Sequence, residues 1–85
     1  MTFTVVLSPS AEQHLAQAWL VSSDRPAVTV AMHQIEQKLS TNPLAAGESR
    51  ASSVTRVDSV YPLGFTFDVV VDDATVYVTA MWLIS

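Results

Sequence analysis

Three residues could act together on a phosphodiester, namely Arg50, Arg56 and Tyr61. Arginine holds phosphate oxygens and stabilises the negative charge that develops on them in a transition state. Tyrosine can stack on a base, although at a strand end it more often packs half-buried. The alternative for Arg56 is an ordinary ion pair with a nearby carboxylate such as Asp58 or Asp68. These three are therefore the weak catalytic candidates of the chain.

Other chemistry-bearing residues are few. His14 and His33 fall on two predicted helices, and two histidines without a third ligand nearby are weak grounds for a metal site. The chain has no cysteine, which excludes disulfides and thiolate metal sites. It has only 2 glycines, so there is no glycine-rich phosphate loop. Asp72 and Asp73 fit a tight turn. We therefore expect no metal and no cofactor.

The composition favours a protein partner over a nucleic acid. Four Lys and Arg stand against eight Asp and Glu, which gives a net charge of −4. A nucleic-acid surface usually needs a basic patch, and four scattered cations cannot supply a strong one. At the same time 49% of the 85 residues are apolar. A domain this small leaves part of that apolar surface exposed, and contiguous exposed apolar surface usually marks a binding face.

The stretch from Thr75 to Ser85, TVYVTAMWLIS, predicts a strand. It contains no charged residue, the last one in the sequence being Asp73. Exposed apolar strands are normally blunted by charge, because they otherwise pair with other chains. We therefore expect this stretch to contact a protein partner or a second copy of the chain. The competing expectation is that the helices bury Trp82 within the monomer. The predicted contact residues are Met81, Trp82, Leu83 and Ile84.

Four strands and two helices must position these residues, in the order β-α-α-β-β-β within one domain, 1–85. Alternating β-branched and aromatic residues predict the strands, and apolar residues at helical spacing predict the helices. Two N-terminal helices should pack on one face of a mainly antiparallel sheet, which is an α+β fold. The first strand could lie at an edge or beside the last one. The predicted strands are Thr2–Ser8, Val54–Tyr61, Gly64–Val71 and Thr75–Leu83, and the helices end near Val21–Ser23 and Ser40.

One apolar stripe on the second helix is expected to form most of a core wall, with Leu15, Ala18 and Trp19 of the first helix alongside. On the last strand, simple alternation places Val76, Val78, Ala80 and Trp82 on one face and Tyr77, Thr79, Met81 and Leu83 on the other. The residues of the stripe are Val28, Ala31, Met32, Ile35 and Leu39.

The segments LSPSAEQHLAQAW, KLSTNPLAAGES and YPLGFTFDVVVDDATVYVTAM, with an arginine at position 56, follow one another in a recognisable order. This layout resembles the RelE/ParE toxin superfamily of type II toxin–antitoxin systems over nearly the whole chain. The resemblance implies a RelE/ParE-like fold and a cognate antitoxin as partner. It also implies a cytoplasmic protein with a role in plasmid stabilisation and no membrane association. The absence of a basic leader and of a long apolar run agrees with this.

The resemblance is incomplete where the family does its chemistry. Members that cleave mRNA on the ribosome use several cations and commonly a late Tyr or His, whereas here only Arg56 matches a basic position. The family arginine of the last strand falls near Trp82, and no Tyr or His follows. We therefore lean against an enzyme and expect a toxin or degenerate relative that acts through protein contacts, possible targets including DNA gyrase. The alternatives are an mRNA endoribonuclease with atypical residues and an unrelated α+β interaction domain.

Overall fold

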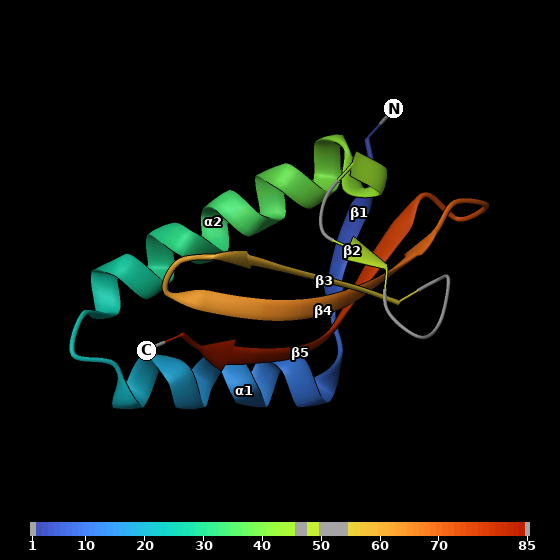
Figure 1. Ribbon diagram of the computed structural model, residues 1–85. Coiled ribbons are helices and arrows are strands. Elements are labelled where there is room, and N and C mark those ends of the chain that lie inside the picture. Colours follow the sequence, from blue (N-terminus) through green and yellow to red (C-terminus); the bar gives the residue numbers. More distant parts are fainter. Residues whose placement is uncertain (1, 46–47, 50–54, 85) are drawn as a thin grey trace.

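Two helices lie against a five-stranded sheet in the computed structural model, which describes residues 2–45, 48–49 and 55–84 (Figure 1). The predicted order β-α-α-β-β-β is confirmed, with a short 3-10 helix η1 and a two-residue strand β2 added between α2 and β3. Val54, the predicted start of the second strand, lies outside the described residues. The elements are β1 (Thr4–Leu7), α1 (Pro9–Val21), α2 (Arg25–Thr41), η1 (Pro43–Ala45), β2 (Glu48–Ser49), β3 (Thr55–Val60), β4 (Leu63–Val70) and β5 (Thr75–Leu83).

The sheet has the strand order β1-β5-β4-β3-β2. β1 runs parallel to β5, and every other neighbouring pair is antiparallel, so the prediction of a mainly antiparallel sheet is confirmed. The two positions considered for the first strand are the same position, because β1 is both an edge strand and the neighbour of β5. Among the described residues, no helix is long and apolar enough to cross a membrane.

Both helices begin at side-chain caps that the sequence contains. The Ser8 hydroxyl accepts from the Ala11 amide at 3.1 Å, and Asp24 Oδ1 accepts from the Ala27 amide at 3.2 Å. Each cap satisfies one of the amides that a first turn leaves without a helical partner. Proline occupies the first turn of both helices, where its fixed φ and missing N–H are tolerated.

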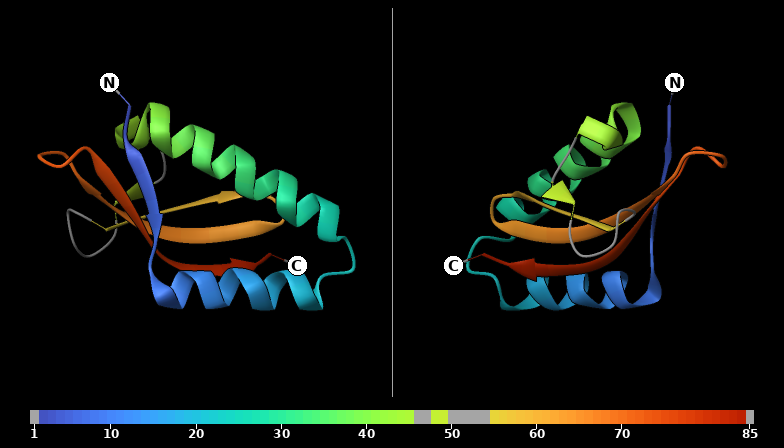
Figure 2. Two further views of the ribbon diagram at one scale, coloured as in Figure 1. Left: turned by 180° about the vertical axis from the view of Figure 1, so that it is seen from behind. Right: turned by 45° about the vertical axis from the view of Figure 1, so that its right-hand side comes forward.

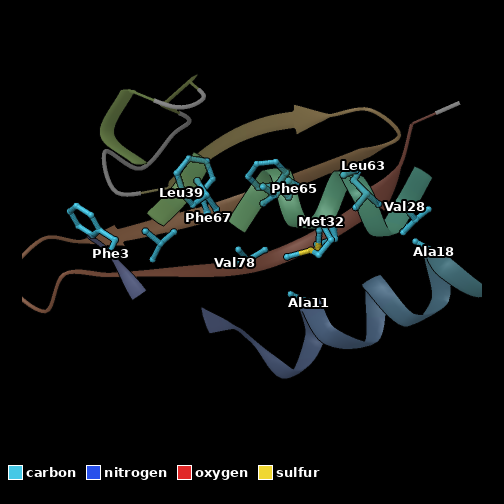
Figure 3. Close-up of a cluster of buried hydrophobic side chains, with 14 residues drawn as sticks. Phe3, Ala11, Ala18, Val28, Met32, Leu39, Leu63, Phe65, Phe67 and Val78 are labelled. Atoms are coloured by element: carbon cyan, nitrogen blue, oxygen red, sulfur yellow. The ribbon is translucent and has the colours of Figure 1, made fainter. Parts of the chain in front are cut away.

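The core lies between α2 and the strands β4 and β5 (Figure 3). All five stripe residues of α2 are buried, as predicted, and Ile35 and Leu39 have no exposed surface. The expectation that Trp19 packs in the core is wrong, since this side chain is 43% exposed. The buried residues contributed by the sheet are Leu63, Phe65, Phe67, Val76, Val78 and Met81.

A β-bulge at Thr79 corrects the predicted facing of β5. Phe67 pairs with Val78 and Thr66 pairs with Ala80, so Thr79 is an extra residue between the two pairs. An extra residue shifts the alternation by one, and every later side chain changes face. Val76 and Val78 therefore share the core with Met81 and Leu83, whereas Trp82 lies on the same face as Tyr77.

Candidate partner-binding surfaces

The three catalytic candidates are not brought together by the fold. Arg56 on β3 pairs in register with Phe67, and directly opposed residues of an antiparallel pair share a face. Its side chain therefore lies on the side of the helices and not on the other side of the sheet. Tyr61 is 74% exposed in the turn after β3, and five residues of strand, roughly 16 Å, separate it from Arg56. Arg50 lies outside the described residues.

The face of the sheet turned away from the helices is here called the open face. The strand register places side chains of β3, β4 and β5 side by side in rows across this face. One row consists of Thr55, Asp68 and Tyr77, and another consists of Ser59, Gly64 and Trp82. Asp68 is the only charged residue on this face among the strand residues whose side chains are described. The Thr66 and Thr79 hydroxyls are hydrogen-bonded to each other at 2.8 Å between the two rows. The open face is thus neutral to acidic, with hydroxyl and aromatic groups.

The four predicted contact residues near the chain end lie in different surroundings. Met81 is only 4% exposed and packs in the core, because the bulge turns it inward. Trp82 is 41% exposed on the open face. Leu83 packs partly against the core, and the Ile84 amide donates to the Pro62 carbonyl at 2.8 Å. Partner contact by these four residues remains a prediction, and Trp82 is the most exposed of them.

The edge of β5 beyond β1 is covered by α1, which sequence reasoning missed. β1 pairs with β5 only as far as Val78. Farther along, the Ser8 hydroxyl donates to the Thr79 carbonyl at 3.3 Å, and the Met81 amide donates to His14 Nδ1 at 3.3 Å. The first helix therefore covers part of this edge, although Trp82 itself is left exposed.

A groove of about 560 Å³ opens between α1 and α2, and its lining residues come from these two helices. The two helices diverge from their connecting turn (Figure 2). Its lining is almost wholly apolar, apart from Glu12, Thr29 and His33. The remaining lining residues are Leu15, Ala16, Trp19, Leu20, Val28 and Met32. A cavity of this size and lining fits one face of a bound helix or a comparable apolar group.

The two ends of this groove differ in charge. At the connecting turn, Arg25 donates to the carbonyls of Trp19 and Leu20, each at 3.1 Å, and its guanidinium lies 4.8 Å from the centre of the Trp19 ring. At the other end, Glu12 lines the groove, and His33 and Glu36 line an adjoining depression beside β1. Both glutamates are exposed, so this end is acidic.

No three metal-ligating side chains of the His, Cys, Asp and Glu types gather anywhere in the described ranges. His14 and His33 lie on different helices and have different surroundings, His14 at the edge of β5 and His33 at the groove. Within the described ranges, the two histidines are therefore not part of one site.

No family model matches this chain, and no curated protein matches it in sequence. Solved structures do match it in fold. A chain of the RelBE2 toxin–antitoxin complex of Mycobacterium tuberculosis superposes with a TM-score of 0.77 at 14% identity, over 98% of this chain and 92% of that one. The chromosomal ParDE system of Pseudomonas aeruginosa gives 0.75 at 13% identity, over 99% and 98%.

The isolated RelE toxin of Escherichia coli is also similar, with a TM-score of 0.72 at 9% identity over 98% of this chain and 85% of that one. The fold is therefore the RelE/ParE toxin fold, as the order and spacing of the sequence motifs predicted. At these identities the likeness concerns the fold, and the activity must be argued from the surfaces described above.

Proposed function

We propose that this chain is the toxin component of a type II toxin–antitoxin system, or a degenerate relative of one, that acts through protein contacts and is neutralised by a cognate antitoxin. The fold supports the proposal, because structures with this fold include RelBE and ParDE toxin–antitoxin complexes. The proposal includes a cytoplasmic location, which suits a chain without cysteine.

The observation that carries the preference for protein contacts is the charge of the open face. Cleavage of RNA requires cations that hold the scissile phosphate and a group that transfers protons. Among the strand residues whose side chains are described, the open face has a single carboxylate and no cation, and Arg56 lies on the side of the helices. This speaks against an mRNA endoribonuclease with atypical residues. It leaves a protein target, such as the gyrase of a ParE-like mode, as the better hypothesis.

The groove between α1 and α2 is the proposed binding site of the antitoxin. An amphipathic helix binds to such a groove through apolar side chains three and four residues apart. Leu15, Trp19 and Met32 offer the apolar contacts, and Glu12 and Glu36 favour basic residues at the β1 end of the bound helix. A segment that folds on binding would also stabilise this small domain, because it binds only the folded state.

Co-expression tests the proposal directly. The chain is induced alone and together with the adjacent upstream or downstream gene, while growth and co-purification are measured. We expect slower growth with the chain alone, restored growth with the partner, and a stable complex. For a degenerate relative, growth is unaffected and the complex still forms. Failure of both neighbours to co-purify with the chain would contradict the proposal.

Transcript mapping separates the protein-binding function from RNA cleavage. Primer extension after induction of wild type and Arg56→Ala should reveal no codon-dependent cuts in either sample. Arg25→Ala is the matched control, because it removes one cation that lies on the helices, away from the open face. Cuts that appear with wild type and Arg25→Ala and disappear with Arg56→Ala would establish an endoribonuclease instead.

A further inference from the structure

We propose that the open face binds an extended, arginine-bearing segment of a protein partner. The arginine is held by Asp68 and Tyr77, and an apolar side chain four residues away packs on Trp82. This inference rests on the proposed protein-binding function and assigns a second contact surface, separate from the groove between the helices. Three observations support it, concerning the carboxylate, the indole and the charges of the chain.

Asp68 is held in place and still has an oxygen to offer. The Thr55 hydroxyl donates to its Oδ1 at 2.8 Å, which fixes the carboxylate on the surface of the sheet. No described group donates to Oδ2. Tyr77 is its directly opposed neighbour on β5 and is 39% exposed. A guanidinium can therefore donate to the carboxylate while its plane stacks on the phenol ring, a combination that suits arginine better than lysine.

The indole of Trp82 covers Gly64 of the neighbouring strand β4. A Cβ added at Gly64 would come within 2.3 Å of the indole Nε1, so the ring occupies the space that any other residue at 64 would fill. Gly64 and Asp68 are four residues apart on β4, which corresponds to roughly 13 Å at a strand rise of about 3.3 Å per residue. An extended segment spans the same distance between residues i and i+4. One side chain can thus reach Asp68 while the other reaches Trp82.

The charge of the open face indicates which kind of molecule binds there. A phosphate backbone would meet Asp68 and no cation on this face of the described strands, so RNA is disfavoured. Within the described residues, a second copy of the chain is also a poor source of a cation for this site. Arg25 already donates to two carbonyls, Lys38 is paired with Asp58 at 2.6 Å, and Arg56 has an interaction of its own. A different protein with a free arginine satisfies the site.

The test uses the whole chain and a synthetic peptide, acetyl-TRTVTLT-amide, which places Arg and Leu four residues apart. Trp19→Phe makes Trp82 the only tryptophan, so its fluorescence reports on the open face. We expect saturable binding to this background protein. Asp68→Asn should weaken it about ten-fold, since a charge-assisted hydrogen bond is lost while the amide oxygen still accepts from Thr55. Asp73→Asn, with the same charge change in the β4–β5 turn, should leave it unchanged.

Two further arms make the result decisive. Replacing the peptide arginine by glutamine should weaken binding to the same extent as Asp68→Asn. Gly64→Ala, which displaces the indole without altering charge, should weaken the same peptide in a calorimetric titration. Equal binding to Asp68→Asn and the background protein, or tighter binding of an oligouridine than of the peptide, overturns the inference. Neither outcome affects co-purification of a partner that binds in the groove between the helices. The proposed function is therefore tested independently of this inference.

Discussion

The two helices have similar apolar spacing but different burial. α2 buries five side chains, among them Ile35 and Leu39 with no exposed surface, whereas α1 buries only Ala11 and Ala18. The larger apolar residues of α1 lie along the groove or in solvent. Leu20 is 60% exposed, for example, and Val21 is 64% exposed. Because alanine contributes little apolar area, α1 adds less to the stability of the isolated chain than α2 does.

This difference assigns separate roles to the helices. α2 holds the sheet together, and α1 covers the edge of β5 while presenting apolar surface to a partner. Exposed apolar groups that stability does not require are a typical mark of an interaction surface.

The largest effect is expected for Ile35→Ala in α2. Ile35 is fully buried, and truncation of a buried isoleucine typically costs about 2–5 kcal/mol through lost burial and the cavity left behind. A domain of this size has a total stability of about 5 kcal/mol. The variant should therefore be mostly unfolded, as measured by circular dichroism and thermal melting. A cooperative melt close to that of wild type would show that α2 does not carry the core.

The sequence was informative wherever local pattern and tertiary packing agreed. The stripe of α2, both helix caps and the order of elements were predictable because each follows from spacing or from residues adjacent in the chain. The sheet faces on which Met81 and Trp82 lie were not predictable from the sequence. They depend on one extra residue, Thr79, whose bulge forms only against Thr66 and Phe67 of another strand.

The edge contact of His14 was equally beyond local pattern. Its partner, the Met81 amide, is 67 residues away in the chain, and a histidine on an exposed helix face carries no sign of such a contact. The charge of the open face was predictable in part. The shortage of cations is visible in the composition, whereas the position of Arg56 on the side of the helices follows only from the strand register.

A smaller effect is expected for His14→Ala in α1. This change removes the acceptor of the Met81 amide, and loss of one such hydrogen bond at a partly buried site costs about 0.5–1 kcal/mol. Chemical denaturation should give a midpoint slightly below that of wild type with an unchanged slope. His33→Ala on α2 is the matched control, since His33 is exposed and no hydrogen bond of its side chain is seen within the described ranges. Equal denaturation midpoints for the two variants would show that the hydrogen bond to His14 does not stabilise the edge of β5.

The smallest effect on stability, and the most informative about binding, is expected for Trp19→Ala. Trp19 is 43% exposed, and its ring stacks on the Arg25 guanidinium, an interaction worth about 0.5 kcal/mol at an exposed site. The variant should melt within a few degrees of wild type. Its affinity for the co-purified partner should fall about 30-fold, because a groove tryptophan has the features of a binding hot spot.

Val30→Ala on α2 is the matched control for this pair of measurements. Val30 is 55% exposed and does not line the groove, so the change should alter neither the melting temperature nor the affinity by much. Unfolding of Trp19→Ala comparable to that of Ile35→Ala would mean that α1 carries core as α2 does, which would erase the contrast between the helices. A variant that is stable and binds with wild-type affinity would keep that contrast and place the partner elsewhere, on the open face or at Trp82, Leu83 and Ile84.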